Sequence, residues 1–104
     1  MGQKGYFIIK PHSERTTLKL KGDFNGKNTL WVKKAMMASK LIQKSALELD
    51  MYEVENIDIQ ALALITITLK TLKESGVVTR VTGLDETKSN LAHRLGMHLI
   101  TQIN

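Results

Sequence analysis

The sequence predicts a single α/β domain, in which a mixed β-sheet of four to five strands is flanked by helices. Segments with the pattern of strands alternate with segments of helical periodicity, in the order β-β-α-β-α-β-α-β. Strands that alternate with helices imply parallel crossovers, and two consecutive strands at the start imply an antiparallel edge. The chain has 104 residues, of which 42% are apolar, so it can bury one hydrophobic core and we expect one domain over residues 1–104.

The first two expected strands are short. Residues 6–10 form an apolar run that Pro11 ends. Residues 17–21 alternate apolar and basic side chains, and this period of two predicts a strand with one buried and one solvated face. Residues 22–26 are rich in Gly, Asp and Asn and are expected to close that strand with a turn.

A helix is expected over about residues 28–44, because apolar residues recur there at helical spacing. Its predicted core face consists of Trp31, Val32, Ala35, Met36 and Ile42. A neighbouring stripe consists of Leu30, Lys33, Met37, Lys40 and Lys44. This stripe is either an ordinary solvated helix face, shielded by lysine stems, or a docking patch for an acidic partner.

The second half of the chain supplies the remaining elements. Residues 46–49 are expected to form a buried strand and the polar residues 50–56 a loop. A helix follows Asp58, whose carboxylate suits an N-cap, and Ser75-Gly76 ends it. The last expected elements are a strand over residues 77–82, a helix over residues 86–95, and a strand or helical turn over residues 97–103.

Composition excludes several classes of protein. The chain has no cysteine, which excludes a disulfide scaffold and a thiolate metal site. Its first residues lack the apolar stretch of a signal peptide. The longest mainly apolar run, residues 57–69, is too short to cross a bilayer. We therefore expect a cytoplasmic protein.

Charge is distributed unevenly along the chain. Residues 1–44 carry ten Lys and Arg against two acids, a balance of +8, whereas residues 45–104 carry five against eight, a balance of −3. The net charge of +5 and the pI near 9.6 suggest a nucleic-acid-binding protein. The acidic second half and the presence of only five aromatic residues disfavour that class.

Motifs for catalysis or cofactor binding are absent from the sequence. No glycine-rich phosphate motif occurs, and residues 22–28, which offer Gly and Lys before a helix, are better explained as a strand-to-helix turn than as an anion site. His12, His93 and His98 lack the spacing of metal ligands, and no serine lies in a GxSxG motif. We expect no catalytic residue, no metal and no cofactor.

Four motifs occur in the order found in one known family. Residues 47–50 and 58–62 resemble its central signature, a buried strand ending in Asp or Asn, a loop, and Asp-Ser-Ser/Gly-Gly-Leu at a helix start. Residues 22–24 resemble the Gly-Asp-Leu that closes its second strand, residues 73–78 its glycine-to-strand joint, and residues 93–97 its leucine-glycine-leucine helix end. From about residue 6 to residue 103 the chain is similar to the STAS domain of anti-sigma factor antagonists.

The resemblance implies both a fold and an interaction surface. In this family helices flank a mixed sheet, and the loop after the third strand, with the start of the following helix, binds an anti-sigma kinase. The serine directly after the Asp is phosphorylated to release the partner. In this chain that position is Ile59, followed by Gln60 and Ala61, and Ile59 has no hydroxyl that could accept a phosphate.

The resemblance therefore implies a non-enzymatic regulatory protein-binding module that is not switched by phosphorylation at the usual site. The expected partner-binding residues are Asp58, Ile59 and Gln60 at the centre, Glu53 and Asn56 on the rim, and Lys33, Met37 and Lys40 nearby. An alternative buries Ile59 in the core.

The implied partner is an anti-sigma factor or a related regulatory kinase. A membrane-transport complex that uses such a domain as a cytoplasmic subunit is the first alternative. A basic nucleic-acid-binding or nucleotide-binding protein is the alternative from a different class.

Overall fold

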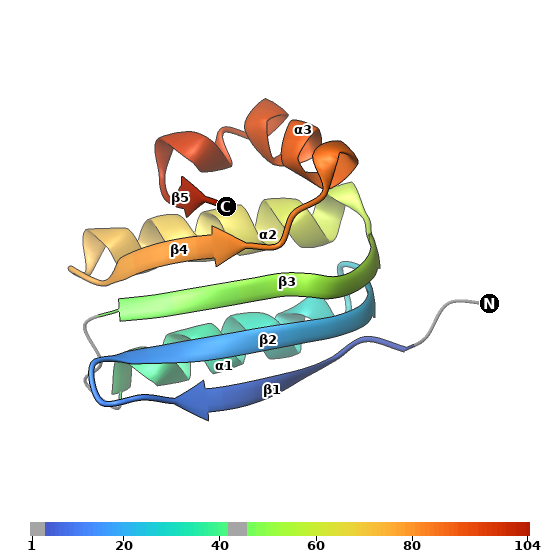
Figure 1. Cartoon of the computed structure of the whole chain (residues 1–104). Coiled ribbons are helices and arrows are strands. Elements are labelled where there is room, and N and C mark those ends of the chain that lie inside the picture. Colours follow the sequence, from blue (N-terminus) through green and yellow to red (C-terminus); the bar gives the residue numbers. More distant parts are fainter. Residues whose placement is uncertain (1–3, 42–45) are drawn as a thin grey trace.

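The structure is a computed structural model that describes residues 4–41 and 46–104, with the side chains of residues 39–41 outside that description. The predicted order of strands and helices is confirmed (Figure 1). The elements are β1 (Tyr6–Pro11), β2 (Arg15–Phe24), α1 (Thr29–Leu41), β3 (Ala46–Ile57), α2 (Ile59–Glu74), β4 (Val78–Thr82), α3 (Glu86–Arg94), the 3₁₀ turn η1 (Met97–Leu99) and β5 (Gln102–Ile103).

The five strands form one mixed sheet in the order β1-β2-β3-β4-β5. β1 is an edge strand that pairs antiparallel with β2, whereas all other neighbours pair in parallel. The pairing of β2 with β3 runs from Arg15 opposite Ala46 to Phe24 opposite Ile57. The predicted fold class, a mixed sheet with an antiparallel edge, is confirmed.

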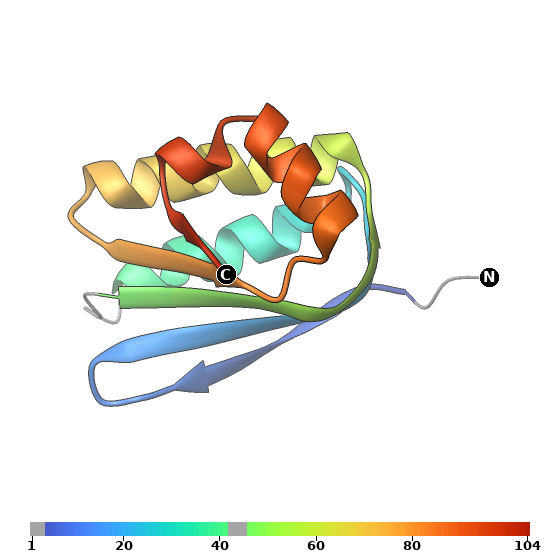
Figure 2. The same cartoon turned by 45° about the horizontal axis from the view of Figure 1, so that its top comes forward.

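Both long helices lie on one face of the sheet, where α1 and α2 pack against each other (Figure 2). The crossovers through α1 and α2 each connect neighbouring parallel strands and step in the same direction. Because such crossovers are right-handed, both helices must fall on the same side of the sheet. No helix of the described residues covers the opposite face, which we call the open face.

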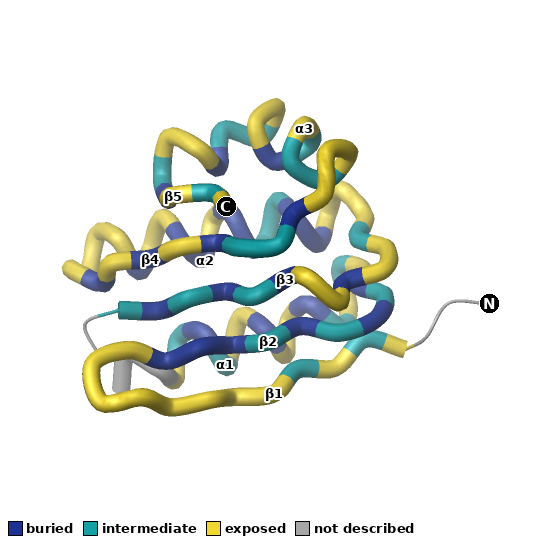
Figure 3. Tube along the Cα trace, viewed as in Figure 1, coloured by how far each residue is buried: buried dark blue, intermediate teal, exposed yellow. Residues whose placement is uncertain are grey.

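The core fills the space between the sheet and the two helices. Buried residues alternate with more exposed ones along β2 from Leu18 onward and along the first half of β3, as a strand with one covered face requires (Figure 3). The largest fully buried side chains are Leu18, Leu20, Met36, Leu49, Met51, Leu62, Ile65, Leu69, Leu72, Met97, Val32 and Val81.

The predicted loop over residues 50–56 is wrong, because these residues form the second half of β3. Met51 and Val54 are buried in the core, while their polar neighbours are more exposed. Shifts of register against β2, between Lys19 and Lys21 and again after Gly22, break the strict alternation of the pattern. A bulged strand with one charged face loses the period of two, so its sequence resembles a polar loop.

Trp31 does not belong to the core, contrary to the prediction from helical spacing. Its side chain is 63% exposed, whereas Val32 and Met36 on the same helix are fully buried. Successive residues are about 100° apart around a helix, so Trp31 lies beside the buried face rather than on it. Ile42, also predicted on that face, lies outside the described residues.

Two glycines with left-handed backbones allow a test of the packing between β3 and the end of β4. Gly83 has a φ of +84° and lies against the backbone of Tyr52, where an added Cβ would clash. Gly76 has a φ of +86° and open space at the same position. Gly76→Ala should therefore lower the free energy of unfolding by only the cost of a side chain in a left-handed backbone, about 1 kcal/mol. Gly83→Ala should lower it by clearly more, because the clash with Tyr52 adds to that cost. Urea denaturation of the two variants measures this difference, and equal losses would contradict the close approach.

Candidate functional site

The C-terminal ends of β2 and β3 lie next to each other, and both long helices begin there (Figure 1). In open α/β sheets this edge brings loops and helix N-termini together, and it is where ligands preferentially bind. We call residues 23–28 and 56–60 the helix-start edge, and treat it as the candidate site.

Asp58 fixes the start of α2, as the sequence predicts. Its Oδ1 accepts a hydrogen bond of 2.8 Å from the backbone N–H of Ala61, which caps the helix. Its own N–H donates to the carbonyl of Phe24 at 3.1 Å, which ties the start of α2 to the end of β2. Asp58 thus determines where the next two residues stand.

Two asparagines that the sequence reasoning did not single out hold the loop between β2 and α1. Oδ1 of Asn25 accepts hydrogen bonds from the N–H groups of Lys27, at 2.8 Å, and Asn28, at 3.0 Å. Oδ1 of Asn28 accepts one from the N–H of Asn25 at 2.8 Å. These amides are the donors that a bound anion would need, so the geometry favours the predicted turn over an anion site. The sequence signal was an asparagine at each end of a short turn before a helix.

Asp23 joins this loop to the end of β3. Its backbone carbonyl accepts a hydrogen bond of 2.8 Å from Nδ2 of Asn28, and its Oδ1 accepts one of 3.0 Å from Nδ2 of Asn56. Asn56, predicted on the rim of the site, is therefore at the helix-start edge and engaged with β2. These bonds make the two strand ends and the two helix starts one connected unit.

Ile59 and Gln60 stand at the surface in the first turn of α2. The Ile59 side chain is 56% exposed, so the alternative in which it folds into the core is wrong. Gln60 lies against the loop, because a Cβ added to Gly26 would come within 2.9 Å of Gln60 Oε1. An apolar side chain thus stands between the exposed residues Asp58 and Gln60.

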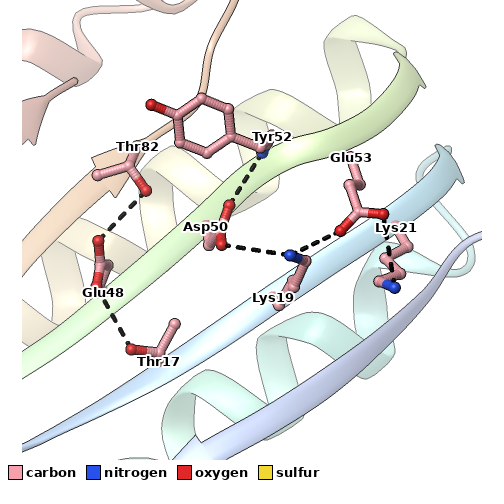
Figure 4. A network of polar contacts seen from close by, with 8 residues as sticks. All are labelled: Thr17, Lys19, Lys21, Glu48, Asp50, Tyr52, Glu53 and Thr82. Carbon is pink, nitrogen blue, oxygen red and sulfur yellow. Dashed lines mark hydrogen bonds and ion pairs between the residues drawn. The ribbon is translucent and has the colours of Figure 1, made fainter.

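Glu53 lies on β3 rather than on a loop, in a network of polar contacts (Figure 4). Its carboxylate contacts Lys19 Nζ at 2.6 Å and Lys21 Nζ at 3.5 Å, and Lys19 also lies 3.9 Å from Asp50. The hydrogen bond to Lys19 lowers the pKa of Glu53, and the same bond raises the pKa of Lys19. Glu53 is therefore committed to partners on β2.

Glu48 forms a second set of contacts on the open face (Figure 4). Its carboxylate accepts hydrogen bonds of 3.4 Å from the hydroxyl groups of Thr17 and Thr82, and it lies 3.3 Å from Arg80 Nη2. The contacts cross three adjacent strands, because Thr17, Glu48 and Arg80 occupy paired register positions. Both oxygens of the Glu48 carboxylate are therefore engaged with neighbouring strands.

Lys33 and Met37 lie on α1, and neither Asp58, Ile59 nor Gln60 lines the pocket that they border. They line a surface pocket of about 480 Å³ together with Lys27, Leu30, Trp31, Lys34 and Ala38. The side chain of Lys40, the third residue predicted there, lies outside the described part of the structure, as do all atoms of Lys44. The structure therefore separates seven of the eight predicted residues into the helix-start edge, the open face and the outer side of α1, and Lys40 is not placed.

Neither a metal site nor a membrane span is found in the described part of the chain. Residues 4–41 and 46–104 contain no group of three or more His, Cys, Asp or Glu side chains placed to hold a metal ion. Within the same residues, no helix is long and apolar enough to cross a membrane. The rings of His93 and His98 stack on each other with centroids 4.4 Å apart.

The sheet order, the two helices on one face and the capped helix after β3 together define the fold class, an open mixed α/β sheet with one uncovered face. The fold is that of anti-sigma factor antagonists. The anti-sigma factor antagonist from Mycobacterium paratuberculosis superposes with a TM-score of 0.83 at 15% identity, over 96% of this chain and 85% of that one.

Two further solved structures have the same fold. The unphosphorylated form of the anti-sigma factor antagonist SpoIIAA gives a TM-score of 0.76 at 11% identity, over 95% of this chain and 88% of that one. A variant of RsbS from Moorella thermoacetica gives a TM-score of 0.80 at 10% identity, over 94% of this chain and 85% of that one. No protein-family model and no curated protein matches the sequence.

The ion pair between Lys19 and Glu53 should affect stability in a defined pH range. The pKa of Glu53 is lowered in the folded chain, so its contribution is present above the ordinary value of 4.5 and is lost as the pH falls through the lowered value. The pKa of Lys19 is raised, so its contribution to stability is present below the ordinary lysine pKa of 10.5 and is lost only as the pH rises through the raised value.

Glu53→Gln should therefore lower the melting temperature at neutral pH and low salt, and this loss should vanish in acid. Thermal unfolding from neutral to acidic pH checks the effect, with Glu55→Gln, another exposed carboxylate of β3, as the matched control. A loss that stays constant at every pH would show that the ion pair does not stabilise the sheet.

Removal of the cap at Asp58 should destabilise the chain in a graded way. Asp58→Ala loses the bond to the Ala61 amide and should cost about 1 kcal/mol in the free energy of unfolding. Asp58→Asn keeps an acceptor and should cost much less. Urea denaturation distinguishes the two, and equal losses for Ala and Asn would mean that the cap is not the main role of Asp58.

Proposed function

We propose that this chain is a non-enzymatic regulatory module that acts by binding and occupying a partner protein, an anti-sigma factor or a related regulatory kinase. The observation that carries the proposal is the exposed Ile59 at the capped start of α2. That position belongs to the helix-start edge of a fold shared with anti-sigma factor antagonists.

The binding is proposed to be constitutive rather than switched. SpoIIAA is known in a phosphorylated form, and that structure has the same fold as this chain at a TM-score of 0.74 and 10% identity. A phosphate at a helix N-terminus adds about two negative charges and can remodel an interface. At the position where the STAS resemblance places the acceptor, this chain has Ile59, whose hydrocarbon side chain cannot be phosphorylated.

The contact is proposed to centre on Ile59, with Asp58 and Gln60 beside it. Apolar anchors at the centre of an interface carry much of the binding energy, and polar neighbours provide register. Asn56 completes the rim. Glu53 contributes to the contact only indirectly. Two lysines of β2 hold its carboxylate, and these ion pairs help to fix the end of β3.

A charge placed at Ile59 should abolish partner capture without unfolding the chain. Ile59→Asp adds a carboxylate at the first turn of α2, where the helix dipole favours a negative charge, so thermal stability should stay near that of the parent. Capture of the partner from an extract of the native host should fall at least about tenfold, because a desolvated charge replaces an apolar anchor. Quantitative mass spectrometry of the captured proteins measures the change.

Ile67→Asp is the matched control, since Ile67 lies on the same helix and is 62% exposed. It should leave capture unchanged. Capture that survives Ile59→Asp would place the contact elsewhere. Captured transporter subunits, instead of an anti-sigma factor or kinase, would support the alternative in which the module belongs to a membrane-transport complex.

A further inference from the structure

The outer side of α1 exposes apolar side chains that the fold does not use. Trp31 is 63% exposed and Leu30 50% exposed, and Met37 and Ala38 lie next to them in the pocket of about 480 Å³. The inward side of the same helix, with Val32 and Met36 fully buried, already supplies its packing against the core. A large aromatic residue left in solvent beside a pocket is typical of a protein-binding surface.

The pocket is surrounded by positive charge. Lys27, Lys33 and Lys34 line it, and Nζ of Lys34 lies 4.7 Å from the centroid of the Trp31 ring, in cation–π contact. The sequence contains no acidic residue between Asp23 and Glu48, so α1 and its flanking loops carry no compensating carboxylate. We call Lys27, Leu30, Trp31, Lys33, Lys34, Met37 and Ala38 the α1 patch.

Charge complementarity decides which occupant the patch fits. A second copy docked through the same patch would place lysines against lysines, which is unfavourable. A flat bilayer surface would meet the lysines, but it would not fill a concave pocket between them. A peptide segment with an apolar stripe and flanking carboxylates satisfies both features, because its apolar side chains enter the pocket while its acids pair with the lysine rim.

We propose that the α1 patch binds an acidic amphipathic helix of a protein partner. The inference rests on the proposed function in that it takes the chain to be a protein-binding module. It adds a second surface and the chemistry of its occupant. The α1 patch begins at Lys27, next to Gly26, and the Gln60 side chain occupies the space that a Cβ at Gly26 would enter. One partner can therefore cover both surfaces, with its acidic helix on α1 and another part on Ile59.

Trp31 reports directly on occupancy of the patch, because it is the single tryptophan of the chain. The probe is a synthetic helical peptide of about 16 residues with leucine at every third or fourth position and glutamate elsewhere. Its burial of Trp31 should shift the fluorescence emission of the full chain to shorter wavelength. The same peptide with lysine in place of glutamate should leave the emission unchanged.

Charge-reversal variants locate the effect. Lys33→Glu combined with Lys34→Glu should weaken binding of the acidic peptide at least about tenfold. Lys70→Glu combined with Lys73→Glu, two exposed lysines of α2, should weaken it far less. A blue shift with phosphatidylserine vesicles but not with the acidic peptide would overturn the proposal in favour of a membrane surface. A shift with neither probe would overturn it outright.

A selection that does not depend on the designed peptide gives a second measurement. Peptides from a random library are selected on the chain and counter-selected on the Trp31→Glu variant, which alters only an exposed position. The expected products combine acidic residues with apolar residues at helical spacing. Enrichment of basic or uncharged peptides, or of peptides that still bind the variant, would contradict the proposal.

The two proposals fail separately. The Ile59→Asp variant should keep the full Trp31 response to the acidic peptide, because Ile59 is not part of the α1 patch. If Trp31 responds normally to the peptide but Ile59→Asp does not change partner capture, the proposed role of the helix-start edge is wrong and the proposal for the α1 patch stands. If partner capture depends on Ile59 but Trp31 does not respond to the peptide, the proposal for the α1 patch is wrong and the proposed function stands.

Discussion

The parallel pairing of β2 with β3 determines how the starts of the two long helices are placed at one edge of the sheet. It brings Phe24 opposite Ile57, so that the next residue, Asp58, can donate its N–H to the Phe24 carbonyl. The start of α2 is thereby placed against the loop that leads into α1. Without that pairing Ile59 would be one more apolar residue on a helix, whereas here it stands among the fixed side chains of two strand ends.

The same pairing explains the uneven charge of the sequence. Basic residues of the first half, Lys19 and Lys21, lie on β2, and acidic residues of the second half lie beside them on β3. Part of the asymmetry between the two halves is therefore complementarity within the fold, expressed on the open face. α1 is different, because Lys33 and Lys34, its lysines with described side chains, form no ion pair with an acid of the described residues. Lys33 and Lys34 thus add uncompensated positive charge to a helix that also exposes Trp31.

The fold was predictable from the sequence because the elements that carry it have strong local patterns. The alternation in residues 17–21, the cap at Asp58 and the order of strands and helices all correspond to what the structure contains. The second half of β3 was not predictable in the same way. Its register shifts against β2 interrupt the alternation, and its polar side chains find partners on another strand that no local pattern reveals.

The candidate site shows the same division. Asp58 could be placed from sequence because capping is a local interaction. The exposure of Ile59 could not, since one apolar residue in a first helical turn packs inward or outward according to the surrounding tertiary structure. Trp31 was misplaced because helical spacing does not define where a buried face ends. Asn25 and Asn28 act through a turn whose importance appears only once α1 and α2 are seen to begin at one edge.

β1 is the outermost strand, and its position has a consequence for the behaviour of the chain at high concentration. It hydrogen-bonds to β2 on one side only, and Tyr6, Ile8 and Ile9 are exposed along it. Such an edge is a template for strand addition by another molecule and so for aggregation. Lys4 and Lys10 stand at its two ends and Pro11 terminates it, and these are the residue types that discourage intermolecular pairing. Protection of this edge thus rests on Lys10 and Pro11 at one end of β1 and on Lys4 at the other, where Lys4 also forms a β-bridge with Asp23 of the helix-start edge.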